Sequence, residues 1–192
     1  THEPVEQLPT LRALPGVRVW RPCDVAETAQ AWVDAVKFSG PTCLSLSRQT
    51  LPFVTRTPEQ AAGMARGGYV LRDCDGQPEV ILIASGSEVS LCLGAYEKLS
   101  AQGRRVRVVS MPCTEIFDAQ DAAYRESVLP SAVRARVAVE ASQPDFWYKY
   151  AGLDGAVVGM DHFGASAPGK VLAEHFGFTV DNVVKAASGL LK

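Results

Sequence analysis

The chain has 192 residues, 47% of them hydrophobic and 21% charged, which is typical of one large or two small globular domains. Its net charge of −2 gives no support to a nucleic-acid-binding surface or a basic membrane patch. No apolar run approaches the roughly 20 residues of a membrane span.

Cysteine usage and the first residues point to a reducing, cytoplasmic location. The cysteines are odd in number and form no C-x-x-C pair, which argues against disulfides and structural zinc. They are Cys23, Cys43, Cys74, Cys92 and Cys113. The start of the chain has neither the basic residues nor the apolar core of a signal peptide. The three histidines have no metal-ligand spacing, so we expect no metal on this chain alone.

A helix is predicted within residues 1–14, because apolar residues recur at helical spacing up to Pro15. Pro4 suits a helix start, whereas Pro9 argues against one continuous helix. His2 would lie just before this helix, where it is either a proton carrier or a solvated side chain.

Residues 17–47 predict a right-handed βαβ unit with parallel strands. The strands are Val17–Arg21 and Thr42–Ser47, and Asp24 caps the helix between them, with Glu27 in the capping-box position. We expect the helix to bury a stripe that consists of Val25, Ala29, Trp32, Val33 and Val36. Parallel strands need both faces covered, and two strands with two helices cannot do that. Residues 1–50 are therefore expected to be the end of a larger domain that extends upstream of Thr1.

Arg48 follows the second strand, where ligands of open α/β sheets bind. Its guanidinium suits a phosphate or a carboxylate. The alternative is a solvated charge at a strand end.

Residues 51–66 carry Pro52, Pro58 and Gly63 without a sustained period and are predicted to be a linker. From residue 67 to residue 192, strands alternate with helices. Tyr69–Arg72 and Val80–Ala84 are predicted to form a hairpin that gives the sheet one antiparallel edge. The remaining predicted elements are a helix capped by Ser87, strands at Val106–Ser110, Arg136–Glu140 and Ala156–Gly159, a charged helix between Phe117 and Val128, a helix at Pro168–Phe176 and a final helix capped by Thr179. The fold class is thus α/β, with a mixed, mostly parallel sheet and helices on both faces, preceded by an incomplete α/β segment.

Three features of this second part leave alternatives open. The turn Ser85–Glu88 either holds a small anion or caps a helix. Glu140, at a strand end, is either catalytic or paired locally. The aromatic residues Phe146–Tyr150 suit a core or an interface.

Ten segments in one order resemble the C-terminal part of a transketolase. They are THEPVEQL, RVWRPCD, LSLSRQTLP, GGYVL, ASGSEVSL, VRVVSMP, YRESVLP, KYAGL, FGASAP and FGFTVDNVV. The resemblance implies a homodimeric, three-domain enzyme that uses thiamine diphosphate and a divalent metal, magnesium or calcium. Such an enzyme moves a two-carbon ketol unit from a ketose phosphate to an aldose phosphate in the pentose phosphate pathway. Residues 1–50 would end the pyrimidine-binding middle domain, and residues 67–192 would be the C-terminal domain.

The resemblance also assigns two site residues. His2 matches the family's histidine beside the reacting carbons, which contacts a substrate hydroxyl and assists proton transfer. Arg48 matches the arginine that binds the sugar phosphate. Glu3 stands where many members have glutamine, and its charge would favour a protonated imidazole at His2.

The resemblance places the family's diphosphate and metal site, and the glutamate that activates the cofactor, outside this chain. Our first interpretation is therefore a transketolase fragment that is inactive alone and binds no cofactor. The alternatives are a small-anion-binding regulatory module that uses the turn Ser85–Glu88, and a split subunit that pairs with a separate N-terminal chain.

Overall fold

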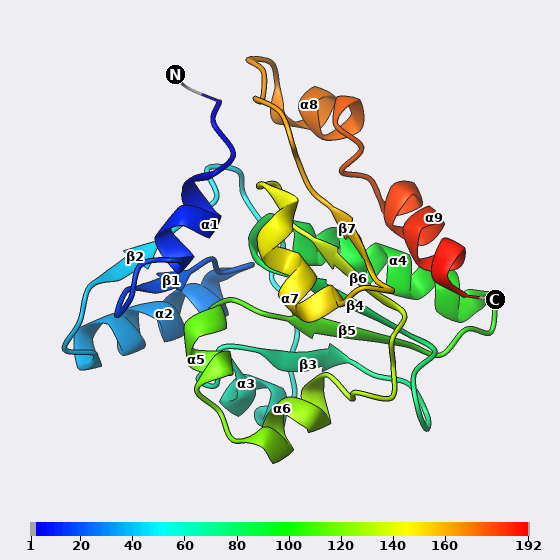
Figure 1. The fold of residues 1–192 in the computed structure, drawn as a ribbon, viewed down its shortest axis with the longest axis horizontal. Coiled ribbons are helices and arrows are strands. Elements are labelled where there is room, and N and C mark those ends of the chain that lie inside the picture. The colour runs from blue at the N-terminus through cyan, green and yellow to red at the C-terminus, as the bar shows by residue number, and fades with distance from the viewer. Residues whose placement is uncertain (1–2, 192) are drawn as a thin grey trace.

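The computed structural model in Figure 1 describes residues 3–191 and contains two sheets. The small sheet holds two parallel strands, β1 (Arg18–Trp20) and β2 (Thr42–Leu44). The large sheet holds five strands in the order β3-β5-β4-β6-β7. These are β3 (Tyr69–Arg72), β4 (Val80–Ala84), β5 (Val106–Ser110), β6 (Arg136–Val139) and β7 (Ala156–Val158). The expected mixed, mostly parallel α/β architecture is confirmed, with β3 as its antiparallel edge.

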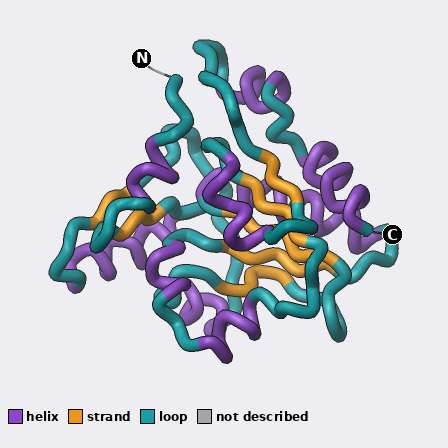
Figure 2. The backbone as a smooth tube through the Cα atoms, viewed as in Figure 1, coloured by secondary structure: helices purple, strands orange, loops and turns teal. Residues whose placement is uncertain are grey.

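Helices cover both faces of the large sheet (Figure 2). The side chains of its strands alternate between two apolar layers that pack against these helices. One layer joins Leu82, Val108 and Val137 to the helices α4 (Val89–Ala101) and α9 (Val180–Leu190). The opposite layer joins strand residues such as Ile83 to a second group of helices. That group comprises α5 (Thr114–Asp118), α6 (Ala122–Val128), the 3₁₀ turn η2 (Pro144–Trp147) and α7 (Tyr148–Ala151).

The hairpin prediction was wrong, because β3 pairs with β5 and not with β4. All five residues of β4 are buried, and the strand has a parallel neighbour on each side, β5 and β6. A hairpin partner would occupy one of those two sides. The chain does turn after β3, through Gly76 at a φ of +75°, but β5 is inserted between the two strands.

The first unit has the predicted parallel βαβ order, with α2 (Val25–Lys37) between β1 and β2. Asp24 caps α2 by accepting a hydrogen bond from the Glu27 amide. The predicted buried stripe was wrong: Trp32 is 55% exposed and Val36 82% exposed, and Val25 and Val33 are exposed too. A stripe is buried only where another element covers it, and the face that α2 turns to its neighbours carries Ala31 and Glu27 instead.

Local differences from the predicted helices have simple causes. α1 (Gln7–Arg12) begins late enough that Pro9 lies in its first turn, where the missing N–H has no intrahelical acceptor. The predicted linker contains α3 (Pro58–Met64), which Thr57 and Gln60 cap reciprocally. The single charged helix is two helices, α5 and α6, and the second starts at its own cap, Asp121.

The predicted N-terminal caps of α4 and α9 had opposite outcomes. Ser87 is not a cap, because it lies within the 3₁₀ turn η1 (Gly86–Glu88) that precedes α4. Thr179 caps α9 as predicted, by accepting a hydrogen bond from the Asn182 amide. The remaining helix, α8 (Gly169–His175), buries none of its residues.

Candidate functional site

A buried ion pair joins α1 to the end of β6. Arg12 donates from Nη1 and Nη2 to the two carboxylate oxygens of Glu140, at 2.8 Å each. Trp147, Ser142 and Ser85 also donate to this carboxylate. Burial alone would raise the pKa of Glu140, but Arg12 and the other donors hold that pKa well below its ordinary value. Glu140 is therefore ionised at neutral pH and already engaged by these donors, so the structure favours local pairing over catalysis.

A second ion pair fills the turn Ser85–Glu88. The Nη1 atom of Arg21 lies 2.6 Å from Oε2 of Glu88, and the guanidinium also donates to the Ser85 carbonyl. The Arg21 carbonyl accepts from the Gly86 amide at 2.9 Å. A Cβ at Gly86 would stand 2.4 Å from Arg21 Nη1, so the arginine occupies the space that an anion would need. The turn therefore gives the anion-binding alternative no support.

A third polar cluster connects α2 to β3 and β5. Glu27 is buried and accepts hydrogen bonds from the hydroxyls of Tyr69 and Ser110, at 2.8 and 2.6 Å. Arg56 donates to the Tyr69 oxygen at 2.7 Å and forms an ion pair with Asp24 at 2.6 Å. Burial opposes the ionised form of Asp24, but hydrogen bonds from Arg56 and two backbone amides lower its pKa. Buried charges thus attach the first 50 residues to the large sheet.

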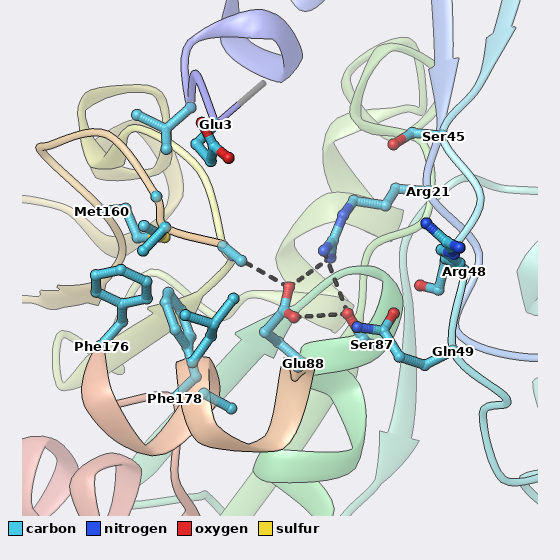
Figure 3. Close-up of a pocket in the computed structure, with 18 of the residues that line it drawn as sticks. Glu3, Arg21, Ser45, Arg48, Gln49, Ser87, Glu88, Met160, Phe176 and Phe178 are labelled. Atoms are coloured by element: carbon cyan, nitrogen blue, oxygen red, sulfur yellow. Dashed lines mark hydrogen bonds and ion pairs between the residues drawn. The ribbon is translucent and has the colours of Figure 1, made fainter. Parts of the chain in front are cut away.

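A cavity of about 430 Å³ opens where these two parts meet (Figure 3). The first part of the chain contributes residues 3–5 and the segment after β2, residues 45–49. The second part contributes η1, the loop after β7, and α8. The lining residues are Glu3, Pro4, Val5, Arg21, Ser45, Leu46, Ser47, Arg48, Gln49, Ser87, Glu88, Ala141, Met160, Gly164, Ala165, Gly169, Leu172, Ala173, Phe176 and Phe178.

Arg48 lies in the wall of this cavity, beyond the carboxyl end of β2, and its side chain is exposed. Within residues 3–191 it makes no ion pair, in contrast to Arg12, Arg21 and Arg56. Glu3 lines the same cavity, and its carbonyl accepts from the Gly164 amide at 2.8 Å. His2, the other predicted site residue, lies outside the described residues.

Sequence reasoning missed the apolar side of the cavity. Met160, Phe176 and Phe178 extend from the large sheet's apolar layer to the cavity wall. The FGF run at residues 176–178 entered the sequence analysis only as the end of a predicted helix and as part of a segment that resembles the family. The topology that brings it opposite Arg48 cannot be read from local spacing.

The described residues do not provide a metal centre or a membrane-spanning helix. Within residues 3–191 no three His, Cys, Asp or Glu side chains are grouped so that they could hold a metal ion. The five cysteines are free thiols. No helix in the same range is both long and apolar enough to cross a bilayer.

Two family models match the chain. The pyrimidine-binding domain of transketolase matches residues 1–54, and the transketolase-like C-terminal domain matches residues 67–179. Transketolase 1 of Escherichia coli is 63% identical over all 192 residues, and Transketolase 1 of Vibrio vulnificus strain YJ016 is 58% identical. The chain spans 29% of the length of these relatives.

Solved structures give the same result. The transketolase from Leishmania mexicana superposes with a TM-score of 0.90 at 45% identity, covering 99% of this chain and 27% of that one. The Campylobacter jejuni enzyme gives a TM-score of 0.85 at 37% identity, covering 96% of this chain and 28% of its own. A split gene transketolase, described as an inactive β4 tetramer, gives 0.79 at 25% identity and is covered over 63% of its length.

Proposed function

Because the chain belongs to the transketolase family, as a C-terminal portion of such an enzyme, we propose that it supplies part of the sugar phosphate site for ketol transfer. The proposed reaction moves a two-carbon unit from a ketose phosphate to an aldose phosphate in the pentose phosphate pathway. The proposed assembly is a cytoplasmic homodimer.

The observation that carries the proposal is the state of Arg48. An exposed arginine without an ion pair among the described residues, in a cavity wall beyond a parallel strand, can bind a phosphate through two N–H donors. Arg12, Arg21 and Arg56 cannot do so without leaving buried carboxylates unpaired. For His2 we propose, from the family motif alone, contact with a substrate hydroxyl and proton transfer.

The described residues do not fit the divalent metal, since no cluster of metal ligands occurs among them. Thiamine diphosphate stabilises a carbanion when it is bound. We propose that both groups, with magnesium or calcium as the metal, are held elsewhere in a longer protein and that the 192-residue chain alone is inactive.

The test has two arms. The purified chain is assayed with thiamine diphosphate, magnesium, xylulose 5-phosphate and ribose 5-phosphate, and no turnover is expected. In the second arm the chain replaces the corresponding segment of Escherichia coli Transketolase 1, and turnover is expected. Turnover by the chain alone, at confirmed mass and purity, would contradict the inactive-fragment proposal.

The chimera also tests Arg48. Arg48→Gln removes a charge-assisted contact, so KM for the sugar phosphate should rise about 10- to 100-fold. Arg125→Gln, at an exposed position on α6, is the matched control and should leave KM unchanged. Equal KM values for the two variants would remove Arg48 from the site.

The split-subunit alternative is favoured by one observation, the similarity to the split gene transketolase, which this chain covers over 63% of its length. If it is correct, coexpression with the remaining N-terminal part of the Escherichia coli relative should restore activity in trans. Activity only from the fused chimera would contradict it.

A further inference from the structure

The cavity between the two parts of the chain has two chemically different walls (Figure 3). Arg48 and Gln49 lie on one side, where they offer a cation and an amide, and the Ser87 hydroxyl beside them already donates to Glu88. Phe176 and Phe178 lie on the other side, and Leu172 lines the cavity from α8. A ligand that fills this space meets a polar end and an apolar end.

The other charges of the cavity restrict where an anion can sit. Arg21 and Glu88 neutralise each other at 2.6 Å, and Glu88 also accepts from the Ala141 amide. Glu3, which makes no ion pair within residues 3–191, disfavours a second anion near its carboxylate. A ligand with one anionic group therefore has one matching position, at Arg48.

A sugar phosphate can make favourable contacts only with the polar wall. Its carbons carry hydroxyl groups, and these would lie against Phe176, Phe178 and Leu172 without hydrogen-bond partners. An apolar or aromatic body would instead remove the half-buried Leu172 and Phe176 from water and pack against the buried Phe178. The volume of about 430 Å³ lies within the ~300–1,000 Å³ that small-molecule sites occupy.

We propose that this cavity binds an amphipathic organic phosphate, with its phosphate at Arg48 and its apolar body against Leu172, Phe176 and Phe178. The inference rests on the proposed function, because both use Arg48 as the phosphate ligand. Such a ligand competes with the sugar phosphate for Arg48. It also contacts both parts of the chain, so binding stabilises the folded state.

The experiment measures binding of phenyl phosphate to the 192-residue chain by calorimetry. Inorganic phosphate, which lacks the aromatic body, and phenol, which lacks the phosphate, are the comparison probes. Phenyl phosphate should bind at least tenfold more tightly than either probe. Leu172→Gln should weaken phenyl phosphate about tenfold and leave inorganic phosphate unchanged. Val171→Gln is the matched control, because Val171 lies on the same helix, is 54% exposed and does not line the cavity.

The two proposals fail in different ways. Equal affinities for phenyl phosphate and inorganic phosphate, or equal effects of the two helix variants, would overturn the amphipathic site and leave the sugar phosphate proposal standing. Phenyl phosphate binding that survives Arg48→Gln would also overturn this inference. An unchanged KM of the Arg48→Gln chimera would instead contradict the proposed sugar phosphate site at Arg48.

Discussion

Arg12 on α1 and Glu140 at the end of β6 lie 128 residues apart in sequence and form a two-point ion pair whose side chains are completely buried. The pair fixes the first helix to the carboxyl end of the large sheet. Because each partner is buried, removal of either one leaves an uncompensated charge.

We expect Arg12→Met and Glu140→Gln each to lower the free energy of unfolding by about 3–5 kcal/mol. The double variant should lose less than the sum, since it leaves no unpaired charge. Urea unfolding followed by circular dichroism measures this. Lys98→Met, in the exposed pair with Asp181, is the control and should cost about 0–1 kcal/mol. Equal losses for the buried and exposed pairs would contradict the role of burial.

The lowered pKa of Glu140 predicts a pH dependence of stability. Its folded-state pKa lies below its ordinary value of 4.5, so the unfolded chain binds more protons as the pH falls. The stabilisation is fully present above the ordinary pKa and is lost as the pH drops below it toward the folded-state value. Urea midpoints measured from pH 6 to pH 3 should fall more steeply for the parent than for Glu140→Gln. Parallel curves would show that Glu140 does not govern acid stability.

The Tyr69 hydroxyl tests the polar cluster beneath α2. It donates to Glu27 and accepts from Arg56, and both partners are largely buried. Tyr69→Phe should therefore cost about 1–3 kcal/mol, the range for leaving buried polar groups unsatisfied. Tyr96→Phe removes an exposed hydrogen bond to the Asp73 carbonyl and should cost about 0.5–1.5 kcal/mol at most. Thermal or urea unfolding of both variants measures these costs, and an equal cost would count against a special role of burial at the Tyr69 hydroxyl.

Alanine substitutions at Gly86 and Gly76 distinguish the stability cost of backbone strain from the cost of displacing a side chain. Both have positive φ, +57° and +75°, but only a Cβ at Gly86 would collide with Arg21. Gly76→Ala should cost about 1–2 kcal/mol from the left-handed conformation alone. Gly86→Ala should cost clearly more, because it also displaces Arg21 from Glu88. Unfolding free energies of the two variants that agree within error would refute the tight fit of Arg21 in this turn.

The exposed stripe of α2 predicts self-association of the chain. Trp32 and Val36 present apolar surface to solvent, and such patches promote association. The double variant Trp32→Gln and Val36→Gln should lower the concentration-dependent increase in sedimentation coefficient and change stability by about 0.5 kcal/mol or less. Unchanged sedimentation would mean that another surface drives any association.

Sequence patterns predicted correctly those elements that neighbouring residues determine. The strand Val106–Ser110 and the cap at Thr179 depend on neighbouring residues, and both agree with the structure. The hairpin and the buried face of α2 failed, since each depends on which distant element lies alongside. Periodicity identifies an apolar face but not its partner.

The candidate site likewise contains residues that local patterns identify and residues that they do not. Arg48 could be singled out because it follows a predicted strand and matches a motif, and it does line the cavity. The opposing wall comes from residues 160–178, more than a hundred positions later in the chain. The buried partners of Glu27 and Glu140 were equally invisible, because ion pairs across the fold leave no local spacing.

The position of β3 has a consequence for the order in which the sheet is assembled. β3 leaves the ribosome before β4, yet its only strand neighbour among residues 3–191 is β5, which is synthesised some 30 residues later. Until β5 has been synthesised, the edge strand has no ladder to join. β3 can therefore enter the large sheet only after a strand that follows it by two in the chain.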